Sequence, residues 1–76
     1  MKTDSRHVLL AALQNAYVYI WSWDDIWEGM VVFRRGDPPV QFRCIDQESA
    51  KSEGLRLAGR SSAHWKESEL PIEWQR

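Results

Sequence analysis

The alternating segment at residues 17–23 constrains the fold more than any other part of the chain. Its sequence, YVYIWSW, has an aromatic residue at every odd position and a smaller residue at every even one. A period of two is that of a β-strand, whose side chains point alternately to the two faces of a sheet. β-Branched and aromatic residues also favour strands. We therefore predict a central strand at residues 17–23 in which both rows are buried, the aromatic row being partly accessible at one end.

The N-terminal segment at residues 4–15 is predicted to be a helix. Asp4 or Ser5 can cap it, and Leu9 and Leu13 are spaced as on one side of a helix. An alternative interpretation makes residues 8–13 a strand. Leucine and alanine are better helix formers than strand formers, which favours the helix.

A β-hairpin is predicted from residues 30–35 and 40–45, preceded by a turn or a single helical turn at residues 24–29. The connection at residues 36–39, GDPP, is strong turn chemistry, because proline fixes its own backbone φ and cannot donate a hydrogen bond within a sheet. We expect the hairpin to close tightly, with residue 35 paired to residue 40.

This predicted register assigns the hairpin side chains to two faces. Phe33 lies opposite Phe42 and Cys44 shares their side, so these three side chains are expected to face the core. Arg34 and Arg43 then fall on the outer face. In this position Cys44 is interpreted as a small buried hydrophobic residue rather than as a reactive thiol.

Residues 47–59 are predicted to form a second helix. Asp46 is a favourable N-cap and Gly59 is a favourable C-terminal stop. The remaining segment, residues 60–76, is predicted to be an extended or partly helical tail packed on the rest. The expected fold is therefore α+β: a small two-layer domain over residues 1–76, with about three antiparallel strands packed with helices, the size that one core can support.

The composition argues against several classes of protein. Ten basic and eleven acidic side chains give a net charge of −1, whereas duplex nucleic-acid binders carry a positive excess that neutralises phosphates. The single cysteine, Cys44, cannot form an internal disulfide, and together with two histidines it does not make a structural zinc site. No stretch approaches the roughly 20 apolar residues of a membrane span. We expect a cytoplasmic protein that binds no metal, no cofactor and no membrane.

An acidic cluster is the main candidate for catalytic chemistry. Asp24, Asp25 and Glu28 lie within one short segment. A metal or acid–base site would need a second cluster to complete it, and the sequence does not specify one. The glycines are dispersed, so no phosphate-binding loop is present. We therefore predict no catalytic residues and no enzymatic activity.

A protein-binding module is the function that the residue types favour. Tryptophan, tyrosine and arginine dominate the energetics of protein interfaces, and this chain combines them with mixed charge. Small phage-encoded inhibitors of host defence, including anti-CRISPR proteins, have this size and style. We expect a phage or bacterial inhibitor or adaptor that binds a larger protein complex, and an exposed aromatic patch would equally permit a homodimer. The residues predicted to contact the protein partner are Asp24, Asp25, Trp27, Glu28, Arg34 and Arg43.

Binding of single-stranded nucleic acid is the alternative. Aromatic side chains on a sheet can stack on bases while arginines contact phosphates. The phenylalanines of the hairpin point away from its arginines, so the platform would have to come from residues 17–23. The residues predicted for this alternative are Tyr17, Tyr19 and Trp21.

Overall fold

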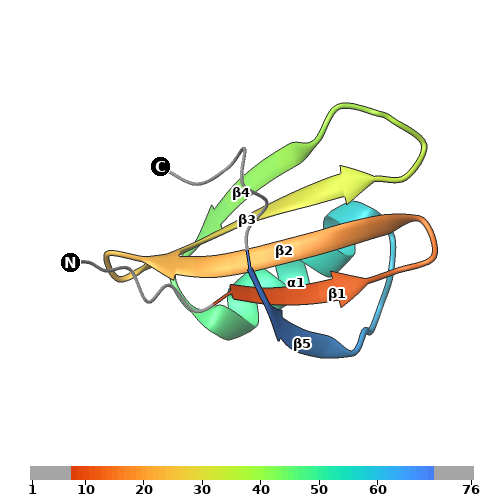
Figure 1. Cartoon of the computed structure of the whole chain (residues 1–76). Coiled ribbons are helices and arrows are strands. Elements are labelled where there is room, and N and C mark those ends of the chain that lie inside the picture. Colours follow the sequence, from red (N-terminus) through yellow and green to blue (C-terminus); the bar gives the residue numbers. More distant parts are fainter. Residues whose placement is uncertain (1–7, 70–76) are drawn as a thin grey trace.

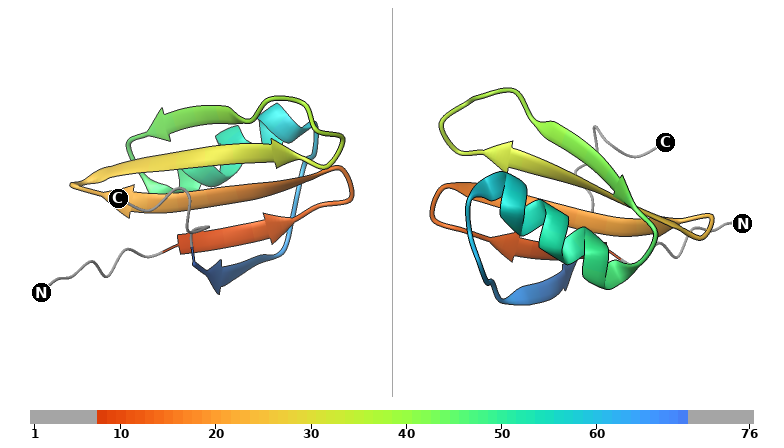
Figure 2. Two further views of the ribbon diagram at one scale, coloured as in Figure 1. Left: turned by 45° about the horizontal axis from the view of Figure 1, so that its top comes forward. Right: turned by 180° about the vertical axis from the view of Figure 1, so that it is seen from behind.

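The computed structural model describes residues 8–69, which form a small α+β domain with one five-stranded antiparallel sheet and one helix (Figure 1). The strand order across the sheet is β4-β3-β2-β1-β5. Helix α1 crosses one face of the sheet, as the view from behind in Figure 2 shows. The elements, in chain order, are β1 (Val8–Ala12), β2 (Ala16–Trp23), β3 (Ile26–Phe33), β4 (Val40–Cys44), α1 (Gln47–Ala58) and β5 (Trp65–Ser68).

Strand β2 is the central strand, as its alternating sequence predicts. Ala16, Val18 and Ile20 point to the face that α1 covers, and each has no exposed surface. The aromatic residues between them point to the opposite face and are only half-buried along the strand, so the predicted burial of both rows holds for one row alone. The two rows therefore have different roles: the small and β-branched row forms the core beneath α1, and the aromatic row lines the other face.

The predicted N-terminal helix at residues 4–15 is wrong over its described part, because residues 8–12 form strand β1. β1 pairs with β2 on one side and with β5 on the other. Its sequence, VLLAA, is apolar throughout, which suits a strand with apolar surroundings on both faces. Helix propensity differs by well under about 1 kcal/mol among such residues, so two pairing partners outweigh it. Residues 4–7 lie outside the described residues.

The turn predicted at residues 24–29 is shorter in the structure. Asp24 and Asp25 alone connect β2 to β3, with φ values of 54° and 67°. Positive φ at both central residues is the requirement of a type I′ hairpin turn, whose twist matches that of the flanking strands. The next strand therefore begins at Ile26 rather than at residue 30, and Gly29 lies inside β3 instead of ending a helical turn.

The hairpin of β3 and β4 has a different register from the tight one predicted. Phe42 lies opposite Gly29 rather than Phe33, and Val40 lies opposite Val31 rather than residue 35. The connection consequently spans residues 34–39. The shift is four residues, an even number, so every side chain keeps its predicted face.

Glycines beneath and above the Phe42 ring explain this register. A Cβ at Gly29 would overlap the ring, and a Cβ on Gly54 of α1 would lie 3.2 Å from the ring and 2.5 Å from Val18 Cγ1. Phe42 is thus packed between the sheet and the helix at the two positions where no side chain intervenes. An aromatic residue covering a cross-strand glycine is a recognised device for fixing register.

Helix α1 confirms the prediction for residues 47–59. The Asp46 carboxylate accepts a hydrogen bond from the Ser49 backbone N–H at 2.8 Å, and Gly59 ends the helix with a left-handed φ of 76°. Its buried side consists mainly of Ala50, Gly54 and Ala58. These small residues let the helix approach β2 and β3 closely.

The described part of the predicted tail contains a strand and no helix. Residues 65–68 form β5, which pairs with β1 at the edge of the sheet and brings the number of strands to five rather than about three. The remainder of the predicted tail, residues 70–76, lies outside the described residues. No helix within residues 8–69 is long and apolar enough to cross a membrane.

Candidate functional site

The sheet face opposite α1, called the open face below, carries most of the residues singled out from the sequence. Within the described residues α1 is the helix that packs on the sheet, and it covers the other face (Figure 2). Strand alternation places on the open face Val8 and Leu10 of β1, the aromatic residues of β2, Ile26, Glu28, Met30 and Val32 of β3, and Gln41 and Arg43 of β4.

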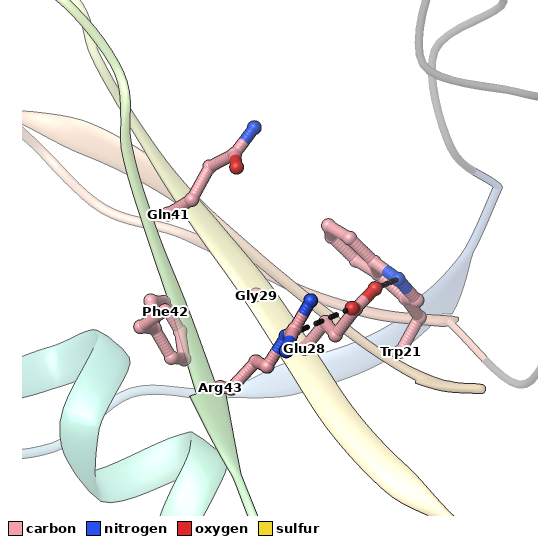
Figure 3. Close-up of a pocket in the computed structure, with 6 residues that line it drawn as sticks. All are labelled: Trp21, Glu28, Gly29, Gln41, Phe42 and Arg43. Atoms are coloured by element: carbon pink, nitrogen blue, oxygen red, sulfur yellow. Dashed lines mark hydrogen bonds and ion pairs between the residues drawn. The ribbon is translucent and has the colours of Figure 1, made fainter. Parts of the chain in front are cut away.

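Three of these side chains form a row across the strands, joined by one hydrogen bond and one ion pair. The Trp21 indole Nε1–H donates to Glu28 Oε1 at 3.0 Å, and Arg43 Nε lies 3.3 Å from Glu28 Oε2 (Figure 3). The residues sit on one rung of the sheet, because Trp21 lies opposite Glu28 and Glu28 opposite Arg43. The Glu28 side chain is 24% exposed and that of Arg43 is 74% exposed. The carboxylate therefore holds the indole by a hydrogen bond and pairs with a guanidinium that is largely in solvent.

A small pocket adjoins this row. Its volume is about 250 Å³, below the range of about 300–1,000 Å³ typical of small-molecule sites. Figure 3 shows Gln41 and Arg43 directed to one side of β4 and Phe42 directed to the other, toward α1. The residues that line the pocket are Trp21, Glu28, Gly29, Gln41, Phe42 and Arg43.

The β2–β3 turn lies beyond this row at one end of the sheet. Asp24 and Asp25 are exposed there, and the last pair of the ladder, Trp23 and Ile26, is 45% and 42% exposed. This end of the sheet thus combines acidic and apolar surface.

The acidic cluster predicted at residues 24–28 is divided by the structure. Asp24 and Asp25 occupy the turn, and Glu28 lies on the open face. Trp27 points to the opposite face, where it packs against the core beside Cys44. Because β3 is a strand here rather than a helical turn, neighbouring residues alternate between faces, and Trp27 does not share a surface with Glu28.

The two arginines predicted to act together lie on the same face but at opposite ends of it. The Arg34 guanidinium carbon lies 4.2 Å from the centroid of the Tyr17 ring, and its Nη1 donates to the Tyr17 hydroxyl at 2.8 Å. Its Nε also donates to the Leu13 carbonyl at 3.0 Å. Arg34 therefore ties the β1–β2 turn to β3, whereas Arg43 belongs to the row with Trp21.

The aromatic row predicted for nucleic-acid stacking is present on the open face. Tyr17, Tyr19 and Trp21 are half-buried and lie on alternate positions of β2. One side of the Tyr17 ring is already covered by Arg34. The structure thus places these rings on the same face as two arginines, and both arginines already have internal partners.

Cys44 has the surroundings of a structural residue. It is partly buried and packs against the core. Burial raises the pKa of its thiol, and the negative charges of Glu53 and Asp46 raise that pKa further. A higher pKa leaves less of the nucleophilic thiolate at neutral pH. Within residues 8–69, no three His, Cys, Asp or Glu side chains come together as a group that could hold a metal ion.

The site residues predicted from the sequence do not include Gln41, Trp23 or Ile26, which lie on or beside this surface. Gln41 is a neutral residue in a strand and carries no sequence signal for function. Trp23 and Ile26 border the acidic segment, but their exposure depends on β2 and β3 extending beyond their neighbours in the sheet. No protein-family model, curated protein or solved structure matches this chain.

Proposed function

We propose that this protein is a non-enzymatic protein-binding module whose contact surface is the open face around Trp21, Glu28 and Arg43. In this role it acts as an inhibitor or adaptor on a larger protein complex. The observation that carries the proposal is the row in which Glu28 positions both the indole of Trp21 and the guanidinium of Arg43.

Such a row suits an interface because its side chains lose little freedom on binding. Tryptophan and arginine are the residue types most enriched among those that dominate binding energy. Ordering a flexible side chain at an interface costs about 0.5–1.5 kcal/mol, and a side chain that is already held avoids part of that cost. The pocket beside Gln41 offers a place for a side chain of the partner.

The charge pattern favours a protein partner over a polyanion. The positive charge of Arg43 is balanced by Glu28, and the nearby turn carries two exposed carboxylates, Asp24 and Asp25. Phosphate backbones are bound by an excess of positive charge. A surface of mixed sign matches the complementary patches of protein interfaces.

Site-specific photo-crosslinking tests the proposal. A photoreactive residue at Gln41 is expected to capture a protein partner from the native host lysate, in a yield that nuclease treatment does not change. The same group at Ser52, which is exposed on the helix side of the molecule, is the matched control and is expected to capture little. Equal yields at the two positions, or a product that disappears with nuclease, would contradict the proposal.

A charge-matched pair of variants gives a second readout. Arg43→Ala and Arg56→Ala each remove one arginine from an exposed ion pair, the first on the open face and the second within α1 with Glu53. Only Arg43→Ala is expected to weaken capture of the partner, by roughly tenfold, which corresponds to about 1.4 kcal/mol. Loss of capture with both variants would indicate a general effect of charge.

Binding of single-stranded nucleic acid is the second candidate, because Tyr17, Tyr19 and Trp21 share the open face with two arginines. It predicts quenching of tryptophan fluorescence by short oligonucleotides and an affinity that falls steeply with salt concentration. It also predicts that Tyr19→Ala weakens binding, by about 1–3 kcal/mol per stacked base. Fluorescence that stays constant at low salt would eliminate this candidate.

A further inference from the structure

Three large apolar side chains that are strongly exposed gather at one end of the sheet. Trp23 is 45%, Ile26 is 42% and Ile45 is 84% exposed. Trp23 lies opposite Ile26, and the last rung between β3 and β4 joins Trp27 to Cys44. Ile26 and Ile45 are the next residues outward from that rung, so all three leave the sheet at the same end. We call these three residues the apolar end; Figure 1 shows the β2–β3 turn and the exit of β4 on the same side.

The position of Ile45 is fixed by its two neighbours. Cys44 packs toward the core beneath α1, and Asp46 must stand at the helix N-terminus to accept its hydrogen bond from Ser49. Ile45 is left between them with its side chain in solvent. Within residues 8–69 it is the most exposed large apolar side chain, and the fold makes no use of it. Clustered exposure of this kind marks interaction sites in folded proteins.

The charge around the apolar end is strongly negative. Residues 21–28 and 43–48, which form this end, contain five carboxylates and one arginine, a formal charge of −4. The other described residues within 8–69 include six basic and four acidic side chains, a formal charge of +2. The arginine, Arg43, is paired with Glu28. Within the described residues, negative charge is therefore concentrated at this end of the sheet, although the net charge of the whole chain is only −1.

We propose that the apolar end docks a cationic amphipathic segment of a protein partner, one that presents apolar side chains flanked by lysine or arginine. This inference rests on the proposed protein-binding function and names the chemistry of the partner. Nucleic acid and anionic membrane surfaces are disfavoured, because they would meet like charge. A second copy of this chain docked end to end is disfavoured for the same reason, since two regions of charge −4 would face each other.

A peptide panel tests this chemistry directly. The probe is an amphipathic helical peptide of leucine and lysine, compared with a leucine–glutamate peptide of the same pattern and with a lysine–serine peptide of the same charge. Only the leucine–lysine peptide is expected to bind the full chain, with an affinity that weakens as salt is raised. Fluorescence anisotropy of labelled peptides gives the dissociation constants.

Variants locate the binding to this end. Ile45→Ser is expected to weaken the peptide by roughly tenfold, since it removes apolar area that only a complex would bury. The double change Asp24→Asn with Asp25→Asn is expected to weaken it by roughly fivefold at low salt and less at high salt. Asparagine tolerates the positive φ of this turn, so the fold should be retained. Asp37→Asn, a single change of the same type in the exposed β3–β4 connection at the other end of β3, is the control and should leave the affinity unchanged.

The outcomes separate this inference from the proposed function. Three results would overturn the inference: binding of the leucine–glutamate peptide as well as its lysine counterpart, no binding of the leucine–lysine peptide, or equal effects of the Asp37 and Asp24/Asp25 changes. If the photoreactive group at Gln41 still captures a protein in that case, the proposed function stands and only the partner chemistry is wrong. Failure of Gln41 crosslinking, with peptide binding that Ile45→Ser weakens, would instead contradict the placement of the contact surface around Glu28.

Discussion

Whether Gly54→Ala stabilises or destabilises the protein depends on two opposing effects, helix propensity and packing. In an exposed helix interior, replacing glycine with alanine gains about 1 kcal/mol, because alanine loses less backbone freedom on folding. At Gly54 the added Cβ would lie 2.5 Å from Val18 Cγ1 and 3.2 Å from the Phe42 ring. Val18 has no exposed surface and α1 lies directly on it, so the helix must move away from the sheet. Overpacking of this kind costs about 1–3 kcal/mol.

We therefore expect Gly54→Ala to destabilise the protein by about 1 kcal/mol, the cost of overpacking less the gain in helix propensity. For a domain of this size that is a fall in Tm of about 4–8 °C. Thermal and urea unfolding, followed by circular dichroism and tryptophan fluorescence, measure it. Ser52, exposed on the same helix, supplies the reference through its change to glycine and to alanine.

The comparison has a clear refuting result. If Gly54→Ala raises the Tm by as much as the Tm of Ser52→Ala exceeds that of Ser52→Gly, then α1 does not approach β2 as closely as described. Gly29→Ala examines the same packing from the sheet side, because its Cβ would overlap the Phe42 ring. It is expected to destabilise the protein by about 1–3 kcal/mol as well. A neutral effect there would mean that Phe42 does not lie over Gly29.

Three further predictions follow from local geometry. Changing Asp24→Asn together with Asp25→Gly should stabilise the protein by about 1 kcal/mol, because Asn-Gly is the preferred type I′ pair; an unchanged urea midpoint would contradict the positive φ values. Cys44 should react with a thiol reagent at pH 8 several-fold more slowly than a free thiol, because burial and the charges of Glu53 and Asp46 raise the pKa of its thiol. A rate equal to that of glutathione would refute the raised pKa. Asp46→Ala should lower the urea midpoint at pH 7. Hydrogen bonds from Ser49 lower the folded-state pKa of the Asp46 carboxyl, so its stabilisation is lost as it is protonated and the difference between the two proteins should shrink as the pH falls below about 3.9. A difference that is constant down to pH 2 would refute the cap.

Local signals predicted the elements that depend on neighbouring residues. The alternation at residues 17–23 and the caps at Asp46 and Gly59 are properties of short segments, and the structure has a strand and a helix there. The apolar run at residues 8–12 has no such signal. Its conformation depends on β5, which is distant in the sequence, and helix propensity pointed the wrong way.

The register of the β3–β4 hairpin shows why part of the site could be predicted and part could not. The face of Arg43 depends only on whether the shift is odd or even, so it was predicted correctly despite the wrong partners. The contact between Glu28 and Arg43 depends on the true register, which is set by Phe42 packing between two glycines. Glycine adds nothing to an apolar pattern. Neither the Glu28–Arg43 contact nor the hydrogen bond from Trp21 to Glu28 could therefore be predicted from the sequence.

The pairing of β5 with β1 joins the last described strand to the first. During synthesis, β1 through α1 emerge before β5, so one edge of β1 has no partner strand until β5 has been made. That edge belongs to the entirely apolar sequence VLLAA, and unpaired apolar edges are templates for pairing with other chains. Pairing of segments that are distant in the sequence also carries a larger loop-closure cost, which slows its formation. Until β5 is added, the apolar edge of β1 is therefore a site where the nascent chain can pair with another molecule.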